Sequence, residues 1–87
     1  MPRVWVPALM RDLTGGVEYI DLPGENVRQV IEAFEKLYPG AADRLLQDGK
    51  LSPTIAVVVD GVTSTLKLRQ PLAPNSQVYF VVALSGG

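Results

Sequence analysis

The sequence predicts an α+β fold in which a mixed sheet of four to five strands packs on one main helix. Three observations lead to this class: β-rich runs near both ends of the chain, a strong apolar run in its second half, and one amphipathic stretch between them. A single helix covers one face of one sheet, so a two-layer arrangement is expected. The β-grasp topology is the economical arrangement for this order, and it places the first and last strands side by side as a central parallel pair.

The length of 87 residues allows one domain and no second core. Hydrophobic residues at 47% and charged residues at 20% are typical of a globular protein and exclude disorder on compositional grounds. We expect residues 1–84 to form the β-grasp domain and residues 85–87 to form a flexible C-terminal diglycine tail.

The first two strands are predicted from alternating runs of strand-forming residues. Residues 3–6 alternate, and Pro7 limits pairing beyond them. Residues 9–16 are predicted as a loop that ends in Thr14-Gly15-Gly16, and residues 17–22 alternate again. The two runs predict a hairpin.

The main helix is predicted to start at a capping box, Asn26 followed three residues later by Gln29. Apolar residues then recur at the spacing of one helical face: Val27, Val30, Ile31, Phe34, Leu37 and Tyr38. Pro39-Gly40 ends the helix, and residues 41–46 are expected to add a short second turn of helix closed by Gly49.

The second half of the chain predicts three further strands. Residues 54–59 form a strong apolar run, and Asp60-Gly61 is a common tight-hairpin pair with a short partner starting at Val62. Residues 64–70 alternate weakly and are expected to be irregular. Residues 78–84 form a nearly continuous apolar run, which suits a central final strand.

The amino-acid composition excludes most classes of enzyme active site. Without cysteine or histidine the chain can form no disulfide, Cys/His zinc site, thiol nucleophile or Ser-His-Asp triad. The carboxylates are dispersed, and no glycine-rich phosphate loop is present. We therefore expect a protein that is not an enzyme, with no metal site and no bound cofactor.

Charge and hydropathy also exclude some partners. The net charge is −1, the basic residues are scattered, and the one local cluster, Lys67-Leu68-Arg69, is interpreted as a solvated strand edge rather than a nucleic-acid footprint. No apolar run is long enough to span a membrane, and no signal-peptide pattern is present. We expect a cytoplasmic protein that binds neither nucleic acid nor membrane.

Strand alternation predicts two different faces of the sheet. One set of residues should face the helix: Val4, Val6, Ile55, Val57, Val59, Val78 and Phe80. The other set should face away from it: Trp5, Ala56, Val58, Tyr79 and Val81. No second helix is available to cover the second set, so we interpret it as a partner-docking face with aromatic anchors.

Over its whole length the chain resembles the ubiquitin-like sulfur carriers. This family includes the small subunit of molybdopterin synthase, the thiamine sulfur carrier and a carrier of cysteine biosynthesis. The resemblance is carried by the helix and by four segments: Val6-Pro7-Ala8-Leu9, Leu13-Thr14-Gly15-Gly16, residues 55–61 and the terminal Gly86-Gly87. The first-hairpin segments are most similar to the cysteine-pathway branch. The chain departs from the family pattern at Asn75-Ser76 and Leu84-Ser85.

The resemblance implies a mechanism centred on Gly87. In the family an adenylating, E1-like enzyme uses ATP to activate the terminal carboxylate, and sulfur then displaces AMP to leave a thiocarboxylate. By this resemblance Gly86, Ser85 and Leu84 would thread into the partner. The sulfur would pass to an accepting enzyme, such as a cysteine-synthase-like protein or the large subunit of molybdopterin synthase.

Two alternatives remain open at the level of sequence. The chain could be a ubiquitin-like modifier that forms isopeptide bonds through Gly87, or a non-covalent interaction module in which the diglycine has no role. The sequence does not identify the acceptor of the sulfur, because the partner enzymes hold that specificity.

Overall fold

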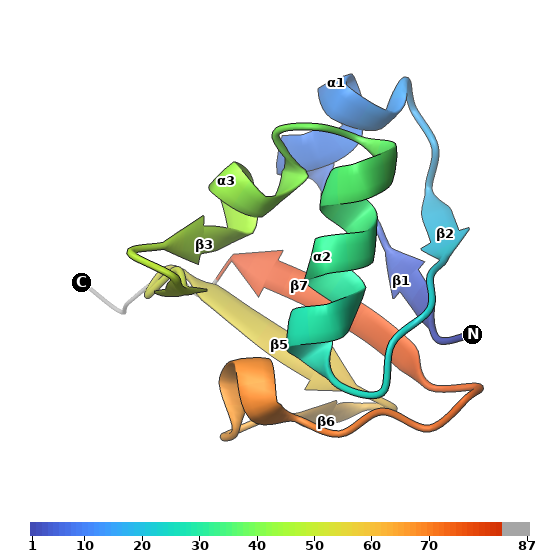
Figure 1. Cartoon of the computed structure of the whole chain (residues 1–87), viewed down its shortest axis with the longest axis vertical. Coiled ribbons are helices and arrows are strands. Elements are labelled where there is room, and N and C mark those ends of the chain that lie inside the picture. Colours follow the sequence, from blue (N-terminus) through green and yellow to red (C-terminus); the bar gives the residue numbers. More distant parts are fainter. Residues whose placement is uncertain (83–87) are drawn as a thin grey trace.

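The computed structural model describes residues 1–82 and confirms the β-grasp prediction. A mixed five-stranded sheet has the order β2-β1-β7-β5-β6, and helix α2 crosses one of its faces (Figure 1). The strands are β1 (Arg3–Trp5), β2 (Tyr19–Asp21), β5 (Ile55–Val59), β6 (Val62–Thr63) and β7 (Gln77–Val82). Each strand lies within the run that predicts it, except that β7 starts one residue earlier, at Gln77.

The centre of the sheet is the predicted parallel pair, β1 beside β7. Strand β2 pairs antiparallel with β1 on one side, while β5 pairs antiparallel with β7 on the other. The register aligns Trp5 with Tyr79, and Tyr79 with Val58. The first and last strands are therefore held together by main-chain hydrogen bonds.

Helix α2 (Val27–Leu37) starts at the predicted cap. The Asn26 side chain accepts a hydrogen bond from the Gln29 amide at 2.9 Å, and the Gln29 side chain accepts one from the Glu25 amide at 2.9 Å. This arrangement is a variant of the capping box, because the returning bond goes to the residue before the cap. Just before it, Gly24 has to be glycine, since a Cβ there would lie 2.7 Å from a methyl of Val30.

The core lies between α2 and the sheet. All seven strand residues predicted to face the helix are buried, and they pack with Val27, Val30, Ile31 and Phe34 of α2. Leu37 was predicted to join this stripe, but as the last residue of the helix it is 59% exposed.

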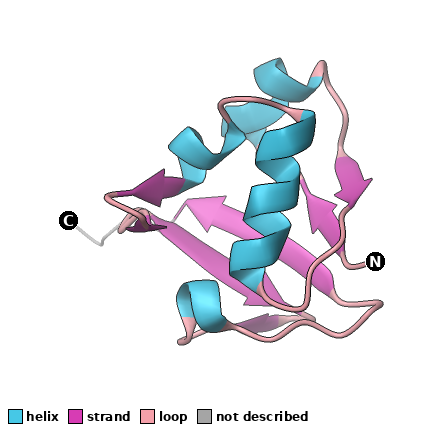
Figure 2. Cartoon of the chain, in the orientation of Figure 1, coloured by secondary structure: helices cyan, strands magenta, loops and turns pink. Residues whose placement is uncertain are grey.

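The prediction of a loop over residues 9–16 is wrong. The chain forms a 3-10 turn, η1 (Ala8–Met10), followed by the short helix α1 (Arg11–Thr14), which ends at Gly15 with φ 67° (Figure 2). Met10 is fully buried in the core and anchors this segment. Helices this short are unstable alone, so tertiary contacts rather than local sequence stabilise them.

The segment after α2 is also more ordered than predicted. Helix α3 (Ala41–Leu45) is present, but Leu46 begins a small hairpin of β3 (Leu46–Gln47) and β4 (Lys50–Leu51). Its turn, Asp48-Gly49, has φ values of 56° and 75°, as a tight two-residue hairpin requires. Gly49 therefore closes a hairpin and not a helix.

The interpretation of Lys67-Leu68-Arg69 as a strand edge is wrong. These residues form the 3-10 turn η2 (Lys67–Arg69), with Leu68 buried and the two cations exposed. Within residues 1–82 no helix is both long and apolar enough to cross a membrane.

Candidate functional site

The face of the sheet that points away from α2 carries a row of aligned side chains from all five strands. The register places Tyr19 beside Trp5, Trp5 beside Tyr79, Tyr79 beside Val58, and Val58 beside Thr63. The neighbouring pair Ala56–Val81 lies two residues further along β7 on the same face. The structure thus brings together the five residues predicted for this face: Trp5, Ala56, Val58, Tyr79 and Val81.

The centre of the row is an aromatic cluster. The rings of Trp5 and Tyr79 are stacked, with centroids 5.6 Å apart and planes at 5°, while Tyr19 lies 5.2 Å from Trp5 at a tilt of 50°. The indole nitrogen Nε1 of Trp5 donates a hydrogen bond of 2.8 Å to Oε1 of Gln77. The cluster is a fixed platform, because stacking and this hydrogen bond hold the indole in one orientation.

Tyr19 was not predicted as part of this face. It belongs to β2, whose side-chain directions were not assigned from the sequence. The alternation of Tyr19-Ile20-Asp21 combined with a hairpin register against β1 would have placed it beside Trp5.

The row of residues next to the aromatic cluster is polar. Nε of Arg3 lies 3.0 Å from Oδ1 of Asp21, and the guanidinium carbon of Arg3 lies 4.1 Å from the centroid of the Tyr19 ring. The hydrogen bond from Arg3 lowers the pKa of Asp21 below its ordinary value, and the same bond raises the pKa of Arg3. The face therefore changes from charged at the start of β7 to apolar towards its end.

The apolar end of this face is accessible. Tyr19, Tyr79 and Val81 are 43%, 38% and 41% exposed, while Trp5, Ala56 and Val58 are half-buried. Beside them lies a hollow of about 550 Å³, lined by residues that include Trp5, Pro7, Leu9, Tyr79 and Val82. Exposed aromatic and aliphatic side chains around a hollow are typical of a protein-binding surface.

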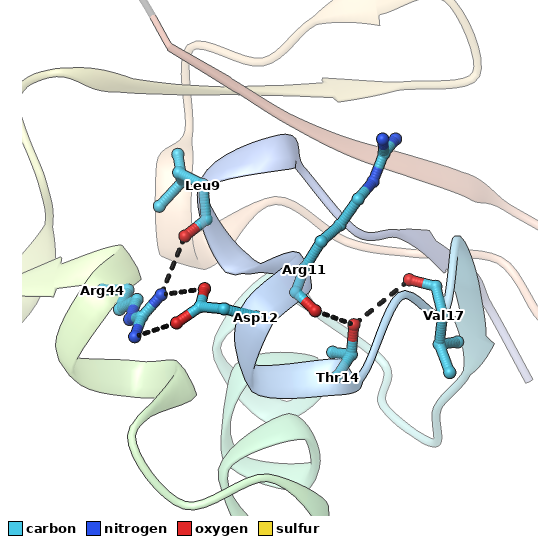
Figure 3. Close-up of polar contacts among 6 residues, drawn as sticks. All are labelled: Leu9, Arg11, Asp12, Thr14, Val17 and Arg44. Carbon is cyan, nitrogen blue, oxygen red and sulfur yellow. Dashed lines mark hydrogen bonds and ion pairs between the residues drawn. The ribbon is translucent and has the colours of Figure 1, made fainter.

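Leu9, in the wall of this hollow, is connected to helix α3 by a polar tie, the contacts of Arg44 with Leu9 and Asp12 (Figure 3). Arg44 of α3 donates to both carboxylate oxygens of Asp12, at 2.6 and 2.9 Å, and to the carbonyl oxygen of Leu9 at 2.8 Å. The hydroxyl of Thr14 lies within hydrogen-bond distance of the carbonyl oxygens of Arg11 and Val17, at 3.4 and 3.2 Å. These contacts hold η1 and α1 in place.

The tie also has an electrostatic effect. The hydrogen bonds from Arg44 lower the pKa of Asp12, and they raise the pKa of Arg44. Helix α3 is positioned for this contact by Glu35, whose carboxylate accepts from the amides of Gly40 and Ala42 at 3.1 and 2.9 Å.

The predicted reactive end lies outside the described residues. Leu84, Ser85, Gly86 and Gly87 follow the last described residue of β7, Val82. Among residues 1–82 no group of three or more Asp and Glu side chains is arranged to hold a metal ion.

Comparison with known proteins gives one family and several similar structures. The model of the ThiS family matches residues 4–87. A chain of the Amycolatopsis orientalis BexX/CysO complex is similar over 100% of both chains, at 25% identity and a TM-score of 0.90. CysO of Mycobacterium tuberculosis is similar over 97% of this chain and 100% of its own, at 25% identity and a TM-score of 0.88.

A third similar structure supports the fold alone. The small archaeal modifier protein 1 of Methanosarcina acetivorans has 21% identity and a TM-score of 0.81, over 99% of this chain and 95% of its own. No curated protein matches this chain in sequence.

Proposed function

The chain belongs to the ThiS family, and from this premise we propose that it is a sulfur carrier whose C-terminal Gly87 is adenylated and converted to a thiocarboxylate. The observation that carries the proposal is the family match itself, because it extends through residue 87 and so includes the Gly86-Gly87 end. In this role the chain is a co-substrate of other enzymes.

The chemistry requires activation by a partner. A carboxylate is a poor electrophile, so a carboxylate oxygen of Gly87 first attacks the α-phosphorus of ATP, which releases pyrophosphate and leaves an acyl adenylate. A sulfur nucleophile then attacks the carbonyl carbon and AMP departs with the oxygen. The chain holds no ATP site of its own in this proposal, and ATP is used by the adenylating, E1-like enzyme.

The terminal residues are suited to a narrow channel. Gly86 and Gly87 have no Cβ, so their backbone can adopt angles that other residues resist. Ordering such a segment in a partner costs conformational entropy, and binding elsewhere has to offset it. Ser85 and Leu84 would enter the same channel.

We assign that offsetting contact to the open face of the sheet. Tyr79 and Val81 lie on β7, and Trp5 lies beside Tyr79 on β1. These side chains supply aromatic and aliphatic area of the kind found at interface hot spots. Ala56 and Val58 extend the same surface onto β5. The adenylating enzyme would dock here while Gly87 reaches its nucleotide site.

The test is the intact mass of the protein after incubation with ATP, a ThiS-family adenylating enzyme and a sulfide source. We expect a gain equal to the exchange of one oxygen for one sulfur, absent when ATP is omitted and absent in a variant lacking Gly87. Val62→Ala, a change at an exposed residue of the edge strand, is the matched control and should leave the mass gain unaltered. As a positive control, the same adenylating enzyme is incubated in parallel with its own carrier protein. If that carrier gains the sulfur and this chain does not, the proposal is contradicted.

For the acceptor we propose an enzyme of the cysteine-synthase-like class. The support is the resemblance of the first-hairpin segments to the cysteine-pathway branch, together with the name CysO in the descriptions of both structures at 25% identity. The large subunit of molybdopterin synthase is the alternative acceptor. Mixing the thiocarboxylated protein with each enzyme and its sulfur-accepting substrate distinguishes them, because only the cognate acceptor consumes the thiocarboxylate mass. The product is an adduct joined through the Gly87 sulfur or, once water hydrolyses that acyl–sulfur bond, the carboxylate.

A further inference from the structure

A second hollow lies on the helix side of the molecule, away from the sheet face assigned to the adenylating enzyme. It has a volume of about 880 Å³ and is bounded by the β3–β4 hairpin, by η2 and by Arg28 of α2. In Figure 1 the hairpin and the short orange turn η2 lie on the same side of α2. Because α2 covers the opposite face of the sheet from Trp5 and Tyr79, both surfaces can be occupied at the same time.

The charge of this hollow differs from that of the whole chain. Four of the eight basic residues of the chain line it, and of the acidic residues within positions 1–82 only Asp48 does. The four are Arg28, Lys50, Lys67 and Arg69. The chain as a whole has a net charge of −1, so the fold concentrates positive charge that is dispersed along the sequence.

These four cations are available to a ligand. Within residues 1–82, none of them forms an ion pair or donates a side-chain hydrogen bond, and all four are exposed. Two arginines elsewhere behave differently, since Arg3 and Arg44 are paired with Asp21 and Asp12. Gathered like charges repel one another, and an anionic ligand would relieve that repulsion.

The hollow has rigid walls. The hydroxyl of Ser64 donates to the side-chain oxygen of Gln70 at 2.7 Å and accepts from the Leu66 amide at 3.1 Å, which fixes the start of η2. On the other side the amide of Ser52 donates to the carbonyl oxygen of Leu45 at 2.8 Å, which fixes the end of the β3–β4 hairpin. The cations are therefore presented on a preorganised frame.

The lining also indicates the chemistry of the ligand. Leu51 and Leu68 are buried at the floor, and Leu66 and Pro53 add apolar surface beside them. Among residues 1–82 no aromatic side chain lines the hollow, so this part of the chain offers it none of the stacking platforms on which single-stranded nucleic acid is bound. An apolar floor with a basic rim suits a segment that carries both carboxylates and aliphatic side chains.

We propose that this hollow, the basic groove, binds an acidic, leucine-containing segment of a partner protein. Carboxylates of the segment would pair with Lys50, Lys67 and Arg69, while an aliphatic side chain would cover Leu68. This contact is separate from the docking of the adenylating enzyme, and it provides a second point of attachment for a partner that recognises the carrier.

The test is a titration of the ¹⁵N-labelled full chain with a short synthetic peptide in which glutamates flank two leucines. We expect amide shifts at Lys50, Lys67, Leu68 and Arg69, and none at Trp5 or Tyr79. Because exposed charges are screened by salt, affinity should fall by about tenfold or more between low and high ionic strength.

Charge reversal makes the test specific. Lys67→Glu and, separately, Lys50→Glu should each weaken peptide binding by about tenfold. Arg11→Glu is the matched control, because Arg11 is an exposed and unpaired cation, within the described residues, that lies outside the groove. An unchanged affinity in both groove variants overturns the proposal, as does an equal loss in the control.

Two further outcomes would also overturn it. One is that inorganic phosphate alone gives the same shifts at the same affinity, which would reduce the groove to a general anion site. The other is that oligouridylate binds the groove more tightly than the peptide, which would assign it to nucleic acid. Variants that do not give a dispersed, folded amide spectrum are replaced by Arg28→Gln, which is expected to weaken binding by about threefold.

Discussion

The two faces of the five-stranded sheet are built from alternate residues of the same strands, yet they differ in what covers them. On β5 and β7 the residues that face α2 are buried, among them Val57 and Phe80, whereas Tyr79 and Val81 are exposed. The covered face obtains its free energy from burial within the chain. The open face leaves part of its apolar surface exposed, and in the proposed function a partner covers that surface, so its residues would contribute to binding more than to folding.

The largest expected effect comes from removing a buried side chain from the covered face. Phe34→Ala removes a fully buried ring between α2 and the sheet, and we expect the free energy of unfolding to fall by about 3 to 5 kcal/mol. Urea denaturation followed by circular dichroism measures this change. If the variant does not fold, Ile31→Val should still be measurable, with a loss of about 1 kcal/mol.

Leu37→Ala is the matched control on the same helix. Leu37 was predicted to lie on the buried stripe but is 59% exposed, so its truncation should change stability by less than about 0.5 kcal/mol. A loss at Leu37 as large as the loss at Phe34 would contradict the division between core and surface described above.

This pair of residues also shows what could be predicted from the sequence. Helical spacing and strand alternation predict which residues face the core, because burial repeats with the period of the element. The end of the stripe cannot be predicted in this way. Leu37 has the right spacing, but whether a partner surface reaches it depends on the position of the sheet.

The hairpin turns make the same point. Asp-Gly occurs twice with the same backbone, φ 51° and 84° at Asp60-Gly61 and φ 56° and 75° at Asp48-Gly49. The first was predicted as a hairpin because a strong apolar run, residues 54–59, precedes it. The second was interpreted as a helix end because its strands have only two residues each and carry no period that a sequence can display.

The next largest effect is expected from removing an aromatic side chain from the open face. Tyr79→Ala should weaken binding of the adenylating enzyme by about 2 kcal/mol, because Tyr79 is an exposed aromatic residue at the centre of the row. The same change should lower the stability of the free protein by only about 1 kcal/mol, through loss of stacking on Trp5. Isothermal titration calorimetry and urea denaturation measure the two quantities.

Val62→Ala serves as the control for that experiment. Val62 is 70% exposed on the edge strand β6, and the register pairs it with Val59 on the covered face, so it is absent from the open row. Equal losses of affinity in Val62→Ala and Tyr79→Ala would show that the open face has no special role.

A third and smaller effect tests how the covering helix begins. Asn26→Ala removes the side-chain oxygen that accepts from the Gln29 amide, and we expect a loss of about 1 kcal/mol in the free energy of unfolding. Asn26→Asp should retain most of that stability because aspartate is an equally good cap. Binding to the open face should be the same in both variants, and a selective loss of binding in Asn26→Ala would contradict the independence of the two faces.

The smallest expected effect concerns pH, and it compares two exposed ion pairs, one between α1 and α3 and one on the open face. Arg44 lowers the pKa of Asp12 at the tie between α1 and α3, and Arg3 lowers the pKa of Asp21 on the open face. A carboxyl whose pKa is lowered on folding adds stability above its unfolded pKa, and that stability is lost as the pH falls through the folded value. Both contributions should therefore be present at neutral pH and disappear in the acid range, below about pH 4.

Asp12→Asn and Asp21→Asn should each flatten the acid limb of the profile of unfolding midpoint against pH, and both changes should shrink at high salt. The two variants should differ in one respect. Arg44 also donates to the carbonyl oxygen of Leu9, so α3 and η1 stay connected in Asp12→Asn, whereas Arg44→Ala removes all three hydrogen bonds. If Arg44→Ala loses more stability than Asp12→Asn, and the difference persists at acid pH, part of the stabilisation comes from the contact with Leu9. Equal curves for the two variants would assign all of it to the carboxylate.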